Sequence, residues 1–195
     1  MTTVHSPWQC AMELFLIPLI LGFALFGASA FTTAYSRRFG ARGGTIVTAV
    51  LRNLLGIPLW VIGYIWAWRV LSPQIFVPGA ITAIVGWILI VAGAAPLLVG
   101  HLYVGMRSHF PSVKDTLVRN GLYAYVRHPI YAGGLLMLPG LVLLRPTLTV
   151  LIASVAAIIW VFIQARLEEI DLIQRIPEYK DYMREVPRFI PRLRR

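Results

Sequence analysis

Long apolar runs alternate along the chain with short polar or glycine- and proline-rich stretches. The first run, 14–34, is about as long as the roughly 20 residues that a helix needs to cross a bilayer. A second run covers 45–71 and a third covers 75–104, which we expect to be broken near Pro96. We therefore predict three membrane spans in the N-terminal half.

The connection between the first two spans is rich in arginine and glycine. Arg37, Arg38 and Arg42 stand there with three glycines, which predicts a short basic loop. Arg52 lies about two turns into the second span, where we expect its long side chain to snorkel back to the same side. Pro58 is expected to kink this span.

The second half begins with the longest polar connection, 107–126, which contains the turn signal Asn120-Gly121. The apolar stretch 130–144 is short for a perpendicular span, and 148–163 returns, so the pair predicts a helical hairpin. The stretch 164–195 is polar and helical in pattern until Pro187. The expected fold class is all-α: a polytopic integral membrane helical bundle of about five transmembrane helices with a C-terminal cytoplasmic helix.

Composition places the chain in the same class. Hydrophobic residues make up 58% of the sequence and charged residues 13%, with a mean hydropathy of +0.73, far from an ordinary soluble domain. A chain of 195 residues is long enough for one compact bundle. We divide it into an N-terminal three-span membrane region, 1–106, and a C-terminal catalytic region, 107–195.

The positive charge is distributed as in a membrane protein. The net charge is +10, but the basic residues stand between apolar runs, so we expect no nucleic-acid partner. Sixteen of the 18 Lys and Arg residues fall on one predicted side, and only Arg69 and Arg145 fall on the other. The positive-inside rule then places the N-terminus outside and the C-terminus in the cytoplasm, in a multi-pass protein of a bacterial or archaeal plasma membrane.

Two polar clusters meet at the predicted cytoplasmic face. One is Arg127-His128-Pro129 with Tyr131, and the other is Glu168-Glu169, each at the end of a hairpin arm. Taken alone, Arg127 is typical of an arginine that anchors a helix at the membrane interface, and the two glutamates are typical of a solvated helix turn. Together, carboxylates and tyrosine rings suit a cationic ligand in a pocket of low dielectric constant.

Other ligand chemistries find little support. Cys10 is the only cysteine, which excludes an intrachain disulfide. His101, His109 and His128 lack a spacing that would converge on one ion, so no metal is expected.

The residues that follow resemble a known family. Gly121-Leu122-Tyr123, Val126-Arg127-His128-Pro129-Ile130-Tyr131, Gly133, Glu168-Glu169, Glu178-Tyr179 and Tyr182 look like the C-terminal half of isoprenylcysteine carboxyl methyltransferases. That family of integral membrane enzymes includes related phospholipid methyltransferases. The resemblance covers about residues 114–191, and it does not extend to the first three spans.

The resemblance implies an S-adenosylmethionine-dependent methyltransferase. The matching positions that would bind the cofactor are Leu117, Val118, Tyr123, His128, Pro129, Tyr131, Glu168 and Glu169. His128 and Arg166 are the implied catalytic residues, because Arg166 lies near a basic position that faces the acceptor. A glutamate of the pair matches the carboxylate that binds the cofactor's amino group.

The sequence departs from the family pattern at several positions. Asp115 stands where histidine is common, Leu122 where proline is common, Gln164 where many relatives have arginine, and Ile176-Pro177 where a glycine is usual. These departures bear on the acceptor. A lipophilic acceptor is implied, either a prenylcysteine-like carboxylate, which needs no general base, or a lipid amine, for which His128 or a glutamate could accept the proton.

Two other functions remain open at this point. Membrane reductases of the steroid-reductase type carry a similar element, but they usually have asparagine where this chain has Ile130. A membrane binding or transport protein would use its basic tail to bind anionic lipid. The sequence leaves the oligomeric state open.

Ala132, Gly133 and Gly134 open the hairpin with small side chains. We expect a gap there between the hairpin and the third span, through which a lipid-soluble acceptor enters. The alternative is that the glycines let two helices pack closely.

Overall fold

The computed structural model describes residues 13–192, which form helices joined by non-helical connections, without a named strand in that range. The helices are α2 (Leu16–Ala28), α3 (Thr32–Ala49), the π-helix η1 (Val50–Gly56), α4 (Ile57–Arg69), α5 (Ala80–Val104), the 3₁₀ turns η2 (Gly105–Ser108) and η3 (Gly121–Ala124), α6 (Pro129–Leu144), α7 (Leu148–Arg175) and α8 (Tyr179–Glu185). The predicted all-α class is confirmed.

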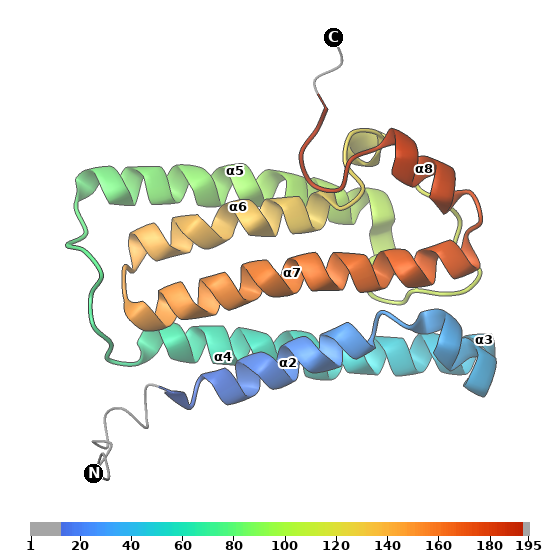
Figure 1. The fold of residues 1–195 in the computed structure, drawn as a ribbon, viewed down its shortest axis with the longest axis horizontal. Coiled ribbons are helices and arrows are strands. Elements are labelled where there is room, and N and C mark those ends of the chain that lie inside the picture. Colours follow the sequence, from blue (N-terminus) through green and yellow to red (C-terminus); the bar gives the residue numbers. More distant parts are fainter. Residues whose placement is uncertain (1–12, 193–195) are drawn as a thin grey trace.

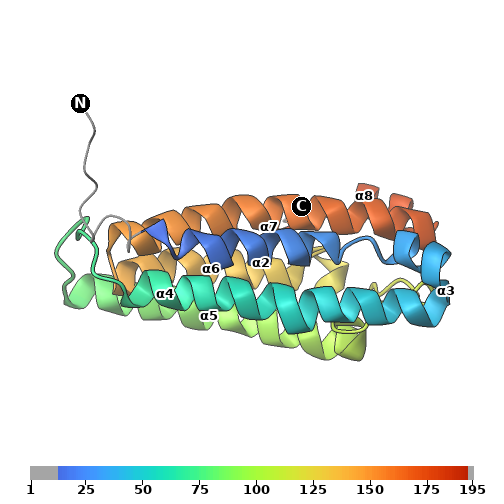
Figure 2. The ribbon, with the colours of Figure 1, turned by 90° about the horizontal axis from the view of Figure 1, so that it is seen from below.

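Five helices, α2, α4, α5, α6 and α7, run side by side along the long axis of the molecule (Figure 1 and Figure 2). Among residues 13–192, three helical stretches are long and apolar enough to cross a membrane: Thr32–Arg69, Ala80–Ser108 and Leu148–Arg175. The apolar helices α2 and α6 have only 13 and 16 residues. The structure therefore supports a membrane bundle with three candidate spans, and the count of five stays a prediction.

The prediction of a basic loop between the first two spans is wrong. Residues 32–49 are helical on both sides of Gly40, which alone has non-helical angles, with φ 74° and ψ 166°. Glycine reaches this positive φ at little steric cost, so the chain turns at one residue and needs no loop. The first apolar helix ends at Ala28, short of the predicted end at residue 34.

Proline acts differently at two places. The π-helix η1 ends immediately before α4, whose second residue is Pro58, so the predicted distortion of this span takes the form of a π-helical stretch. The predicted break near Pro96 is wrong, because α5 continues through this residue. Membrane helices tolerate proline where neighbouring groups compensate for the lost backbone hydrogen bond.

Helices α5 and α6 pack at glycine contacts. A Cβ atom added to Gly133 would lie 2.8 Å from the backbone nitrogen of Leu97, and one added to Gly86 would lie 3.0 Å from the carbonyl oxygen of Gly140. The expected gap between the hairpin and the third span is therefore wrong at Gly133, where only glycine lets the backbones approach this closely. A Cβ on Gly134 would meet nothing within 4 Å.

Two hydrophobic clusters hold the bundle and its polar end together. The larger joins α2, α4, α6 and α7 through Phe15, Leu19, Phe23, Tyr64, Ala67, Leu138, Val150, Ala153 and Ala157. The smaller joins Ile176, Tyr179, Tyr182 and Val186, with Leu117 packed against them. It fastens α8 and the polar connection 105–128 to the end of α7, which breaks at Ile176-Pro177 (Figure 1).

Candidate functional site

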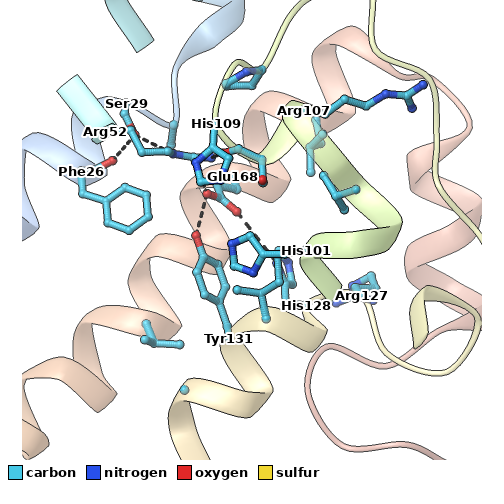
Figure 3. Close-up of a pocket in the computed structure, with 18 of the residues that line it drawn as sticks. Phe26, Ser29, Arg52, His101, Arg107, His109, Arg127, His128, Tyr131 and Glu168 are labelled. Carbon is cyan, nitrogen blue, oxygen red and sulfur yellow. Dashed lines mark hydrogen bonds and ion pairs between the residues drawn. The ribbon is translucent and has the colours of Figure 1, made fainter. Parts of the chain in front are cut away.

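A cavity of about 480 Å³ lies between the helices and the polar connection. Its apolar part includes Phe23, Phe26, Trp60, Tyr64, Met137, Leu138, Leu141 and Trp160, and its polar part includes Arg52, His101, Asp115, Arg127, His128, Tyr131, Glu168, Asp171 and Arg175. Figure 3 shows the side chains from several helices that meet in it. One continuous cavity thus joins an apolar compartment inside the bundle to a charged one at the bundle's end.

Glu168 is at the centre of the charged compartment. Its Oε1 accepts hydrogen bonds from Arg52 at 2.5 Å, from the Tyr131 hydroxyl at 2.7 Å and from Gln164 Nε2 at 3.0 Å. Its Oε2 lies 4.0 Å from Nδ1 of His128. Gln164 precedes Glu168 by one helical turn on α7, so the helix itself places the amide beside the carboxylate.

Arg52 belongs to the site, and its predicted position at the membrane surface is wrong. It does not snorkel to the surface: besides Glu168, it donates to the Ser108 carbonyl oxygen at 2.7 Å and to Ser29 Oγ at 3.4 Å. Its guanidinium also lies over the Phe26 ring, 5.0 Å from the centroid (Figure 3). An arginine inside an apolar span is a functional candidate by default, and that signal was present in the sequence.

Glu169 has a different environment from its neighbour. Its side chain is completely buried, and it is not among the residues that line the cavity. It lies 3.0 Å from Arg127 Nη2, 3.3 Å from His128 Nε2 and 2.5 Å from Arg188 Nη2. The hydrogen bond to Glu169 raises the pKa of Arg188, which keeps this guanidinium charged. Glu169 thus joins α7, the start of α6 and the C-terminal segment.

Arg127 completes this connection. It donates to the carbonyl oxygens of Met183 at 2.6 Å and Val186 at 2.7 Å. The backbone nitrogens of Arg127 and His128 also donate to the carbonyl oxygens of Pro187 and Arg188, at 2.9 and 3.0 Å. The C-terminal segment is therefore held against the beginning of α6.

Most of the predicted cofactor residues line the cavity. His128 stacks on Tyr131 with ring centroids 5.5 Å apart, and Leu117, Val118 and Tyr123 line another part of the wall. Burial raises the pKa of Tyr123 well above its usual range, so the ring stays neutral. The structure brings together Leu117, Val118, Tyr123, His128, Tyr131 and Glu168.

Three predicted residues are placed elsewhere. Pro129 is buried as the first residue of α6 and supports the histidine before it, but does not line the cavity. Glu169 lies behind the wall, as described above. Arg166 is exposed and does not line the cavity, so the structure does not bring this expected catalytic residue to the others.

A second ionic group, formed by Asp115, Asp171 and Arg175, lines the polar end of the cavity. Arg175 Nη1 lies 2.9 Å from Asp115 and 2.5 Å from the Ser112 carbonyl oxygen, and its Nε lies 3.0 Å from Asp171. Asp171 also accepts a hydrogen bond from the Thr33 backbone nitrogen at 2.8 Å. This group explains Asp115, which departs from the family pattern: it anchors the polar connection to α7.

The histidines of the polar end lie closer together than their sequence spacing suggested. The His101 and His109 rings stack with centroids 5.8 Å apart, and both line the cavity. Within residues 13–192, no group of three or more His, Cys, Asp or Glu side chains is arranged to hold a metal ion.

Comparison with known proteins identifies the class of this bundle and its cavity. The family model described as phospholipid methyltransferase matches residues 74–178, which is more than half of the chain. The chain therefore belongs to the phospholipid methyltransferase family. This confirms the resemblance found in the C-terminal half.

Two curated relatives share sequence similarity with this chain. The chain is 29% identical over 146 residues to methanethiol S-methyltransferase 2 of Bradyrhizobium diazoefficiens, covering 66% of this chain and 54% of the relative. It is 34% identical over 94 residues to the cobalt-zinc-cadmium resistance protein CzcN of Cupriavidus metallidurans, covering 47% and 41%. The chain thus spans about half the length of these relatives. No solved structure matches significantly.

Proposed function

We propose that this chain is an integral membrane, S-adenosylmethionine-dependent methyltransferase that acts on a lipophilic acceptor at the cytoplasmic membrane face. The observation that carries the proposal is the position of Glu168. Its carboxylate faces a cavity whose other part lies among apolar and aromatic side chains inside the bundle. A charged cofactor and an apolar acceptor would each find a matching environment in the same cavity.

The charged compartment fits S-adenosylmethionine by the chemistry of its side chains. The open Oε2 of Glu168 suits a protonated amino group, since a charge-assisted hydrogen bond is strongest away from bulk water. Leu117, Val118 and the neutral ring of Tyr123 offer a wall for the flat adenosine portion. Tyr131 and His128 would fix the orientation of the carboxylate that binds the amino group.

Methyl transfer from a sulfonium requires little covalent catalysis by the protein. The cofactor supplies a methyl group on a sulfonium, which is transferred to the acceptor's electron pair while the sulfur leaves as a neutral thioether. The residues of the site position the reactants in line and exclude water, effects worth up to about 7–11 kcal/mol. For an amine acceptor, His128 would take up the proton that the amine loses.

The apolar compartment supports a lipophilic acceptor. Phe23, Trp60, Met137 and Trp160 line it, and a prenylcysteine-like carboxylate or a lipid amine would place its hydrocarbon part among them. A thiol is the second candidate acceptor, favoured by the name of the relative from Bradyrhizobium diazoefficiens. Incubating the protein with labelled cofactor and each acceptor class would separate them.

Calorimetric binding to the purified protein in detergent tests the cofactor. We expect wild type to bind S-adenosylmethionine, and Glu168→Gln to weaken binding by about 1.5–3 kcal/mol because a charge-assisted contact is lost. The matched control is Glu178→Gln, at an exposed position outside the cavity lining, which should leave the affinity unchanged. Binding of NADPH in place of S-adenosylmethionine would support a reductase, and binding of neither would support a non-enzymatic membrane protein.

A further inference from the structure

Arg52 and Glu168 form an ion pair between the two halves of the chain. Arg52 lies on the π-helix η1, and Glu168 lies 116 positions later on α7. Their side chains are 12% and 18% exposed, and both line the cavity. Arg52 lies outside residues 74–178, which match the family model, so neither the family match nor the resemblance assigns it a role.

The hydrogen bonds of this pair are unevenly distributed. Within residues 13–192, Glu168 Oε1 accepts three hydrogen bonds, whereas Oε2 has none and only approaches His128 at 4.0 Å. A guanidinium has five N–H donors, and Arg52 uses three of them within the same residues. One carboxylate oxygen and two N–H donors of the pair thus have no hydrogen-bond partner among these residues, and both side chains line the cavity.

Charge decides which ligand suits such a pair. A lone glutamate would favour any cation, but here the neighbouring guanidinium cancels the carboxylate charge and repels a ligand that carries only an ammonium. A ligand head with an ammonium and a carboxylate side by side would satisfy both members at once, since each of its charges would meet the opposite one. This is the pattern of a free α-amino acid head.

We propose that Arg52 and Glu168 together bind the zwitterionic amino-acid head of the cofactor: Glu168 binds its ammonium group and Arg52 binds its carboxylate. This inference rests on the proposed function, because it names how the same site recognises S-adenosylmethionine. Arg52 thereby selects ligands that retain the carboxylate. The π-helix η1 matters to the site because it carries Arg52 into the cavity.

Two ligands test the proposal by calorimetry: S-adenosylmethionine and its decarboxylated analogue. We expect Arg52→Gln to weaken the binding of S-adenosylmethionine roughly 10–100-fold, which is the effect of losing one charge-assisted contact. The same variant should bind the decarboxylated analogue at least as tightly as wild type, because Glu168 is freed of its competing cation. Glu168→Gln should weaken the binding of both ligands.

Arg42→Gln is the matched control, because Arg42 is an exposed arginine of α3 that does not line the cavity. It should change neither affinity. Arg52→Lys keeps the charge and should restore part of the affinity for S-adenosylmethionine, which also covers the case in which Arg52→Gln fails to fold. Thermal unfolding of each variant shows which ones are folded.

The outcomes separate the two proposals. If the folded Arg52→Gln variant binds both ligands more weakly by the same factor, Arg52 only positions Glu168 and the inference is wrong. If it weakens neither, Arg52 has no role in binding, while the proposed function stands. If wild type binds neither ligand, the proposed function itself fails.

Discussion

Glu169 Oε2 lies 2.5 Å from the Nη2 atom of Arg188, whereas the preceding carboxylate on the same helix, Glu168, faces the cavity. Consecutive side chains on an α-helix point about 100° apart, so two adjacent glutamates face different surroundings. Glu169 is completely buried beside Arg127 and His128, which immediately precede α6, and beside Arg188 of the C-terminal segment. The pair that looks like one acidic motif in the sequence therefore divides into a carboxylate that lines the cavity and one that is buried in an ionic network.

Glu169→Gln should destabilise the fold. The change removes the charge that compensates Arg127 and Arg188, and breaking a buried ion pair from one side costs about 3–5 kcal/mol. Denaturant unfolding in detergent, followed by tryptophan fluorescence, would measure this loss. Glu185→Gln is the control, because its pair with Arg119 is exposed and should contribute about 1 kcal/mol or less. A stable Glu169→Gln variant that no longer binds cofactor would reverse the roles assigned to the two glutamates.

Tyr182 should make the folded state sensitive to alkaline pH. Burial raises its pKa to about 12, even though Arg127 and Arg119 lower it, while an unfolded tyrosine titrates near 10. Between these two values the unfolded chain loses the proton and the folded chain keeps it. The contribution to stability is thus complete below about pH 10 and is lost as the pH rises toward 12.

The variant Tyr182→Phe tests this dependence. It removes the hydrogen bond from the Tyr182 hydroxyl to the Tyr123 carbonyl oxygen, 2.6 Å long, and should cost about 0.5–1.5 kcal/mol at neutral pH. The decline of unfolding free energy between pH 10 and 12 should also become shallower than in wild type. Tyr125→Phe, at an exposed position, should change neither quantity. An equally steep decline in Tyr182→Phe would assign the alkaline transition to another group.

The sequence was most informative where apolar length and a local motif coincide. The hairpin of α6 and α7 begins within a residue or so of its predicted limits, because Pro129 and the Arg145-Pro146 turn mark helix boundaries directly. The motif around His128 likewise identified the polar end of the cavity. Both signals are local, so one sequence is enough to read them.

Contacts between distant segments could not be predicted in the same way. The partner of Arg52 lies on another helix, and the π-helix η1 that carries this arginine was not predicted. The helical turn at Gly40 resembled a loop because glycine is disfavoured inside helices and common in turns. The separation of Glu168 from Glu169 depends on how α7 is rotated against its neighbours, which a sequence pattern does not fix.

The orientation in the membrane is open to a labelling experiment. Arg69 and Arg145 lie where α4 and α6 finish, whereas the C-terminal segment lies beside the beginning of α6 (Figure 1). In a Cys10→Ser background, a cysteine at the exposed Val77 should react with an impermeant reagent added to intact cells. A cysteine at Ile190 should react only after lysis, since the basic end is expected in the cytoplasm. Labelling of residue 190 in intact cells would invert the predicted topology.

The adjacent glycines of α6 should respond oppositely to an added methyl group. At Gly133 the new Cβ would lie 2.8 Å from the Leu97 nitrogen, and overpacking of this kind costs about 1–3 kcal/mol. At Gly134 nothing lies within 4 Å, so alanine should be neutral, or stabilising by up to about 1 kcal/mol through its higher helix propensity. Thermal unfolding of Gly133→Ala and Gly134→Ala measures the difference.

A larger side chain at Gly134 extends the comparison to function. Gly134 lines the cavity with the apolar residues Met137 and Leu138, so Gly134→Leu should fill space in the compartment assigned to the acceptor. We expect acceptor turnover to fall at least tenfold while the calorimetric affinity for S-adenosylmethionine stays within about threefold, because Glu168 and its partners are not displaced. Gly134→Ala is the matched control and should retain turnover. Loss of cofactor affinity in a folded Gly134→Leu variant would place the cofactor in the apolar compartment, and the acceptor would then have to bind elsewhere.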